Sequence, residues 1–271
     1  MIAALIILIV LVVLFVLFIL SMAVRTGRSD MKALRGFAYA HRGLHGDGVP
    51  ENSMEAFRLA LEGGYGIELD VHLMKDGNLA VIHDSSLLRT AGVDIRIEDL
   101  TAEELPKYPL EGTTEIIPLY SQVLELYAGK APIILELKPV GNVAALTEAA
   151  CKIMDTYQGV YCMESFDPRC INWLKKNRPD VLRGQLSENY FAGTKAKIPA
   201  YLKLVLANHL LNFTTCPDFI ACRYSDRNLW TTKLCRGLWG PETVTWTLKT
   251  QEEFDTAVKE GWIPIFEGFR P

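Results

Sequence analysis

Strand-like and helix-like segments alternate through most of the 271 residues, and this alternation most limits what the chain can fold into. Short apolar runs bounded by turn residues indicate strands, whereas apolar residues three and four apart indicate helices. Strands are expected at residues 37–41, 66–73, 79–83, 133–137, 161–166, 182–186, 219–222, 243–247 and 262–266. Helical patterns fill the gaps, for example at residues 143–157, 201–211 and 251–260.

Roughly eight such repeats predict a TIM-like (β/α)8 barrel of ordinary size within the α/β class. The rival is a doubly wound open sheet, which commonly carries a Gly-rich phosphate loop, and neither GxGxxG nor GxxxxGK[ST] occurs here. Polar motifs instead follow several different strands, which is where a barrel builds its active site. Residues 85–118 interrupt the alternation of strand-like and helix-like segments. They predict a small insertion after the second strand, with a short helix capped by Thr101 and Glu104.

Two local predictions concern helices. Asn52, with Glu55 three residues later, predicts the N-cap of a helix that ends at Gly63 and Gly64. Residues 201–211 are apolar but too short to span a bilayer and are interrupted by Lys203, so we expect a packed helix there.

The first twenty residues carry only apolar side chains. As a helix they would be about 30 Å long, which matches the hydrocarbon core of a bilayer. No Lys or Arg precedes them, so an uncleaved anchor is favoured over a signal peptide. We therefore expect a transmembrane anchor at residues 1–24, a linker at 25–36 and a barrel at 37–271. The span is followed by four basic residues, Arg25, Arg28, Lys32 and Arg35. By the positive-inside rule they predict a single-pass protein of the cell membrane with a cytoplasmic barrel.

Composition excludes some functions. The net charge of −4 provides no basic surface for nucleic acid. The six cysteines form no CxxC pair, so neither a zinc site nor a redox motif is indicated, and buried free thiols are expected.

Three acidic residues lie in strand-like segments. Glu68 and Asp70 are two apart and project to one face of their strand, as do Glu136 and Lys138 in another. Burying several carboxylates without a cation costs several kcal/mol each. Three oxygen ligands suit Mg²⁺ or Ca²⁺ and not zinc, so Glu68, Asp70 and Glu136 predict a site for one divalent cation.

Two histidines and two cations complete this set. His41 and His83 each end a strand and are candidates for general acid and base, because imidazole titrates near neutral pH. Arg42 and Lys138 are candidate donors to phosphate oxygens. A lone histidine is more often structural, and this interpretation is applied to the remaining three, which are His45, His72 and His209. Together these residues are typical of metal-assisted chemistry on a phosphate ester.

The motifs, taken in order, resemble the glycerophosphodiester phosphodiesterase family. They are His41-Arg42-Gly43, Pro50-Glu51-Asn52, Glu68-Leu69-Asp70, Lys75-Asp76-Gly77, His83-Asp84 and Glu136-Leu137-Lys138. The resemblance implies a TIM-like barrel, a metal on the three acids and an acid–base pair of histidines, and it places Trp246 in the substrate wall. The last strand departs from the family pattern, which leaves Glu267 without an assigned role.

The expected activity is therefore metal-dependent hydrolysis of a glycerophosphodiester to glycerol 3-phosphate and an alcohol. The substrate would be a small or lipid-derived phosphodiester, because the anchor places the enzyme at a membrane. One alternative is a phospholipase D-like or lysophospholipase D activity on lipid diesters. Another is a catalytically silent, membrane-anchored binding module. The presence of both histidines and all three carboxylates argues against the silent module, because buried ion clusters can often be replaced by apolar residues at little cost.

Overall fold

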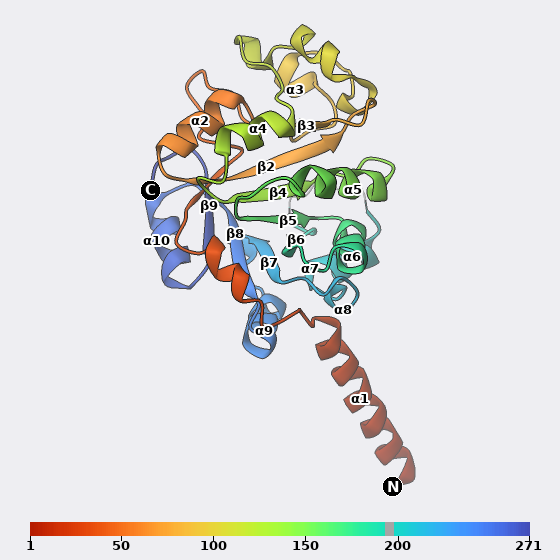
Figure 1. Cartoon of the computed structure of the whole chain (residues 1–271). Coiled ribbons are helices and arrows are strands. Elements are labelled where there is room, and N and C mark those ends of the chain that lie inside the picture. The colour runs from red at the N-terminus through yellow and green to blue at the C-terminus, as the bar shows by residue number, and fades with distance from the viewer. Residues whose placement is uncertain (193–197) are drawn as a thin grey trace.

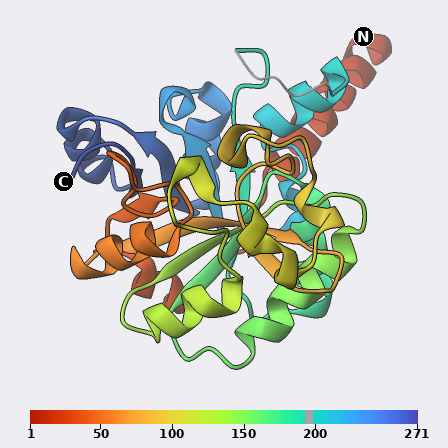
Figure 2. The same ribbon diagram turned by 90° about the horizontal axis from the view of Figure 1, so that it is seen from above.

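The computed structural model describes residues 1–192 and 198–271, and its body is a closed barrel of eight parallel strands (Figures 1 and 2). β1 pairs with both β2 and β9, which closes the sheet and excludes the open doubly wound alternative. The predicted barrel is confirmed, and its strands begin and end within two residues of the predicted positions. They are β1 (Tyr39–His41), β2 (Gly66–Leu73), β4 (Ile133–Leu137), β5 (Tyr161–Ser165), β6 (Arg183–Ser187), β7 (Phe219–Arg223), β8 (Glu242–Leu248) and β9 (Ile263–Phe266).

Helices form a ring outside the barrel, as the view in Figure 2 shows. α5 (Val143–Met154), for example, buries one apolar stripe that includes Leu146, Ala150 and Met154, at spacings of four residues. Side-chain caps start several of them, for example Asn142 before α5 and Thr250 before α10. The helices are α2 (Met54–Glu62), α4 (Tyr120–Tyr127), α5 (Val143–Met154), α6 (Pro168–Asn177), α7 (Ala200–Ala207), α8 (Asn212–Thr215), α9 (Trp230–Trp239) and α10 (Gln251–Lys259).

The predicted cap of α2 is wrong by one residue. Ser53 is the N-cap, and its hydroxyl accepts from the amide of Ala56 at 3.1 Å. Asn52 is instead held at φ +55° and donates its side-chain amide to Asp70 at 3.0 Å. An Asn tolerates this left-handed backbone better than most residues, so it turns towards the barrel while its neighbour starts the helix.

The predicted insertion is present and has its own small core. β3 (Leu79–Val81) runs antiparallel to the end of β2, and the insertion follows it. Leu87, Ile97, Leu105 and Leu110 are buried together there. The capping box of Thr101 and Glu104 is confirmed, although the helix it starts is 3₁₀. The short helices are α3 (Leu88–Ala91), η2 (Ile97–Asp99), η3 (Ala102–Lys107) and η4 (Leu110–Gly112).

Apolar residues fill the end of the barrel where the strands begin. η1 (Ser29–Leu34) places Met31 and Leu34 against Tyr39 in this cluster. Gly184 lies so close to the Phe219 ring that a Cβ would come within 2.1 Å of it, so only glycine fits there. This packing fills one end and leaves the opposite end for polar residues.

α1 (Ile2–Ser21) extends away from the barrel (Figure 1), and it is the one helix in the described ranges that is long and apolar enough to cross a membrane. α7 differs from its prediction. Ala207 is its only buried residue, while Tyr201 is 66% exposed and Leu204 is 54% exposed. The expectation of a packed helix over residues 201–211 is therefore confirmed only in part: α7 ends at Ala207, and it packs through one face, where Leu202, Val205 and Leu206 are half-buried. All six cysteines are free and five are buried, as expected.

Candidate active site

Polar side chains from several strands meet at the end of the barrel where the strands finish. They line a cavity of about 270 Å³. Seven of the eight predicted site residues line this cavity, and the eighth, Asp70, contacts one of them, with its Oδ1 atom 3.2 Å from the Lys138 ammonium. The seven are His41, Arg42, Glu68, His83, Glu136, Lys138 and Trp246.

Three carboxylates form the floor of the site. Asp70 of β2 lies opposite Glu136 of β4 in the sheet register, and Glu68 lies two residues before Asp70 on the same face. One oxygen from each lies within 4.8 Å of the others, and all three side chains are buried. Buried carboxylates of this kind need a cation, and the all-oxygen donor set fits a hard divalent metal.

Two basic side chains reach into the same cluster. The Lys138 ammonium lies 2.7 Å from Glu136 and 3.2 Å from Asp70. Arg42 pairs with Glu51 at 2.9 Å, and its Nε atom, 3.5 Å from Asp70, has no hydrogen-bond partner. The protein therefore supplies part of the positive charge that the carboxylates require.

Burial and neighbouring charges shift the pKa values of the three carboxylates in different directions. Burial raises the pKa of Glu68 well above its usual value, and the neighbouring Asp70 and Glu136 add to this. Burial also raises the pKa of Glu136 to about 7, although Lys138 opposes it. Burial alone would raise the pKa of Asp70, but Lys138, His83 and Arg42 outweigh it and hold that pKa well below its usual value. Asp70 is thus the fixed negative charge of the cluster.

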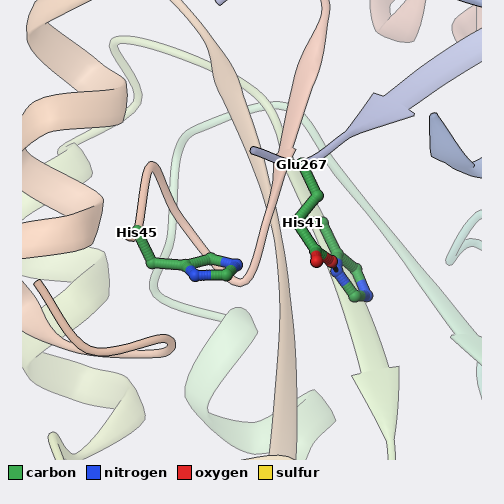
Figure 3. Close-up of side chains that lie close together, drawn as sticks. All are labelled: His41, His45 and Glu267. Atoms are coloured by element: carbon green, nitrogen blue, oxygen red, sulfur yellow. Dashed lines mark hydrogen bonds and ion pairs between the residues drawn. The ribbon is translucent and has the colours of Figure 1, made fainter. Parts of the chain in front are cut away.

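A carboxylate orients His41. Its Nδ1 atom lies 2.5 Å from Glu267 Oε2 (Figure 3). Its Nε2 atom lies 3.9 Å from Glu68 Oε2, and both His41 and Glu68 line the cavity. Burial lowers the pKa of His41, and the hydrogen bond from His41 lowers the pKa of Glu267 to about 2. A neutral His41 therefore donates its Nδ1 proton to Glu267, which leaves Nε2 free to accept one.

His83 is arranged in the same way. Its Nδ1 atom lies 2.7 Å from Asp84 Oδ1, and burial lowers its pKa to about 4. His72 donates from Nε2 to the backbone carbonyl of His83 at 3.1 Å, so it supports the backbone and does not line the cavity. His209 is likewise buried outside the cavity and bonds Thr232, in line with the structural interpretation.

His45 lies beside this arrangement. One ligand atom each of His45, His41 and Glu267 lie within 4.8 Å of one another (Figure 3). His45 Nε2 is buried without a hydrogen-bond partner. Because Glu267 already accepts the Nδ1 proton of His41, we interpret this group as one that orients His41.

Several residues of the cavity are not among those predicted from the sequence. Glu164 of β5 is buried next to Glu136, and its Oε2 atom has no hydrogen-bond partner. Burial raises the pKa of Glu164 well above its usual value. An acid inside an apolar strand is the signal that marks Glu68, and the same signal is present at Glu164. Phe166, with its ring edge-on to that of Trp246, and the ion pair of Glu188 with Arg223 complete the wall.

The closed barrel, with polar groups gathered where its strands end, is that of a barrel enzyme. A family model described as the glycerophosphoryl diester phosphodiesterase family matches residues 41–266. The chain belongs to this family. The match begins at His41, so it includes every predicted site residue.

Curated relatives agree with this assignment. A glycerophosphodiester phosphodiesterase from Caldanaerobacter subterraneus subsp. tengcongensis is 28% identical over 84% of this chain and 92% of its own length. One from Bacillus altitudinis is 43% identical over 37% of this chain and 43% of its own length. A lysophospholipase D from Rattus norvegicus is 37% identical over 38% of this chain and 37% of its own length. The last two matches thus span less than half of those relatives.

Solved structures share the fold. A glycerophosphoryl diester phosphodiesterase structure from Silicibacter pomeroyi has a TM-score of 0.72 at 21% identity, and the match covers 90% of this chain and 95% of that one. A phosphodiesterase from Oleispira antarctica, solved in complex with the product sn-glycerol-3-phosphate, has a TM-score of 0.68 at 22% identity. That match covers 85% of this chain and 92% of the other.

Proposed function

We propose that the protein hydrolyses glycerophosphodiesters to glycerol 3-phosphate and an alcohol in a metal-dependent reaction. The observation that carries this proposal is the cavity, where three buried carboxylates lie beneath two histidines that are each held at Nδ1 by a carboxylate. The glycerol-3-phosphate complex of the Oleispira antarctica relative agrees with this choice of product.

Glu68, Asp70 and Glu136 would hold one divalent cation, Mg²⁺ or Ca²⁺. The buried, unpartnered oxygen of Glu164 at the same end of the barrel also favours a cation there. A bound divalent cation would polarise the phosphate and lower the pKa of the attacking group, which is either water or a glycerol hydroxyl of the substrate. The chain's own residues would supply the proton transfers and orientation.

His41 and His83 would act as the acid–base pair. Each presents a ring whose Nδ1 atom is occupied by a carboxylate, so that Nε2 is the nitrogen left for substrate. One ring would take the proton of the attacking oxygen, and the other would give a proton to the departing alcohol. The Nδ1 hydrogen bonds fix the ring orientation that these transfers require.

Arg42 and Lys138 would bind non-bridging phosphate oxygens. Both already face the carboxylates, and the unpartnered Nε of Arg42 leaves a donor for phosphate. Trp246, together with Phe166, would form an apolar wall beside the glycerol or its substituent. The cation of Arg223 lies 5.5 Å from the Trp246 ring and holds that ring in place.

A membrane location is part of the proposal. α1 would span the cell membrane and leave the barrel on the cytoplasmic side. A helix of 20 residues with no Asp, Glu, Lys or Arg supports a span. Arg25, Arg28 and Lys32, which lie between α1 and the barrel, support the cytoplasmic side. The glycerol phosphate half of the substrate could then carry an acyl chain, which makes lysophospholipase D activity the second candidate. The Rattus norvegicus relative favours this candidate.

The test is release of glycerol 3-phosphate or lysophosphatidic acid by the full chain in detergent. Substrates are glycerophosphocholine, glycerophosphoethanolamine and lysophosphatidylcholine, each with Mg²⁺, Ca²⁺ or EDTA. His83→Asn and Glu68→Gln should abolish turnover, whereas Glu103→Gln, an exposed carboxylate outside the cavity, should retain most of it. Turnover of glycerophosphocholine supports the first activity, and turnover of lysophosphatidylcholine alone supports the second. A folded protein that cleaves none of them would favour a silent binding module.

A further inference from the structure

α1 joins the barrel without a flexible spacer. Met22 immediately follows the helix and is fully buried, and Val24 is also buried. The Arg25 amide donates to the carbonyl of Pro217 at 2.9 Å, and its guanidinium donates to Asp218 at 2.5 Å. These contacts fix the barrel at the end of α1, so any layer that α1 crosses lies directly beside the adjoining barrel surface.

That adjoining surface is formed by α7, α8 and the start of α9. The rings of Phe18 in α1 and Trp230 in α9 are stacked with centroids 5.6 Å apart. α8 contacts α1, and the Thr231 hydroxyl of α9 donates to Asn208, which follows α7, at 3.0 Å. Both views show these helices around the point where α1 leaves the barrel (Figures 1 and 2).

Four large apolar or amphipathic side chains on these helices face solvent. We name them the apolar collar, and each is more than half exposed: Tyr201, Leu204, Phe213 and Trp230. Lys203 is the only charged residue in α7 and α8. A helix that is apolar around most of its surface is normally buried in protein or lipid. In α7 the described residues leave Tyr201 and Leu204 more than half exposed.

The length of α1 places the collar at the edge of a bilayer. Twenty helical residues are about 30 Å long, which equals the hydrocarbon thickness. Phe18 lies in the last turn, so its partner Trp230 lies at the level where hydrocarbon meets headgroups. Trp and Tyr are the residues enriched at that level.

We propose that the apolar collar inserts into the headgroup layer of the membrane that α1 spans. The occupant of this surface is therefore a lipid bilayer. The barrel contacts the membrane directly and is not attached to it through α1 alone. This inference rests on the proposed membrane-spanning role of α1 and is independent of the catalytic roles proposed above.

The test uses the full chain in phosphatidylcholine vesicles, either unmodified or brominated on their acyl chains. Tyr201→Trp places a reporter in the collar. Leu88→Trp is the matched control, because Leu88 is 59% exposed in the insertion and Tyr201 is 66% exposed. The emission that each variant adds to wild type is compared between the two vesicle types. We expect the brominated lipid to remove most of the emission added by Tyr201→Trp and none of that added by Leu88→Trp.

Two results would overturn the inference. One is a protein that floats with the vesicles but whose Tyr201→Trp emission is no more quenched than that of Leu88→Trp. The other is a protein that fails to float with the vesicles, since α1 would then not insert. Neither result depends on turnover, so a failure here is distinguishable from a failure of the proposed phosphodiesterase activity.

Discussion

His41 Nδ1 and Glu267 Oε2 lie 2.5 Å apart, although 226 positions separate the two residues in the chain. The register of the barrel explains this contact. Ala40 of β1 pairs with Phe266 of β9, so the next residue along each strand is His41 and Glu267. His83 has a comparable partner in Asp84, 2.7 Å from its Nδ1 atom. Both histidines therefore enter the cavity with a fixed ring orientation.

Loss of the Glu267 carboxylate should slow catalysis and leave substrate binding largely intact. We expect Glu267→Gln to reduce kcat by roughly 10- to 100-fold, as for other partners that orient a reacting group, with little change in KM. Steady-state kinetics on glycerophosphocholine measure both constants. Lys249→Gln is the control, because the exposed Lys249 contacts the other Glu267 oxygen at 3.4 Å and does not reach His41. Equal losses in the two variants would contradict an orienting role for Glu267.

Metal removal should abolish activity but not the fold. Lys138 lies 2.7 Å from Glu136 and 3.2 Å from Asp70, so it balances part of their charge when no cation is bound. With EDTA, we expect the circular dichroism spectrum to remain that of a folded protein, while Tm falls because a bound ion stabilises only the native state. Adding Mg²⁺ or Ca²⁺ should restore turnover. Unfolding in EDTA at room temperature would show that Lys138 does not serve this role.

The junction between α1 and the barrel should contribute to barrel stability. Met22 is fully buried, and we expect Met22→Ala to destabilise the protein by about 2–4 kcal/mol, because it leaves a cavity in the core. Leu17→Ala is the matched control, since Leu17 is 56% exposed. Thermal unfolding of the full chain in detergent compares them. Similar Tm values for Met22→Ala and wild type would mean that the junction is loose.

Glu98 should make stability depend on acid pH. It accepts hydrogen bonds from His72 at 2.7 Å and Ser85 at 2.6 Å, which outweigh partial burial and lower its pKa to about 2 from 4.5. A lowered pKa stabilises the fold above about pH 4.5, and this stabilisation is lost as the pH falls towards 2. Because solvent screens the carboxylate, we expect Glu98→Gln to cost about 1–2 kcal/mol at pH 7.

Urea unfolding of wild type and Glu98→Gln between pH 7 and pH 2 measures this dependence. The difference in unfolding free energy between them should shrink as the pH falls through the window. The neighbouring Asp99→Asn variant should differ little from wild type throughout, because Asp99 is exposed. A difference between wild type and Glu98→Gln that is constant with pH would rule out the ionised Glu98 as its source.

The sequence predicted the barrel and the carboxylate floor because both depend on local patterns. Alternation along β2 places Glu68 and Asp70 on one face, and an acid within an apolar strand marks a polar site wherever the strand lies. Glu267 could not be assigned a role, because its contact with His41 exists only once β1 and β9 pair. Asn52 was misassigned because its bond to Asp70 depends on a backbone conformation that residue type alone does not specify. The exposure of α7 was missed because an apolar pattern does not reveal what covers it.

The pairing of β1 with β9 also determines when the site first exists. β1 is the first strand of the barrel to leave the ribosome, and β9 is the last. Glu267 is therefore synthesised only after all the strands of the barrel, and the His41 ring has no carboxylate partner at Nδ1 until then. An incomplete nascent barrel lacks this histidine–carboxylate pair, so the site is completed only when the barrel itself closes.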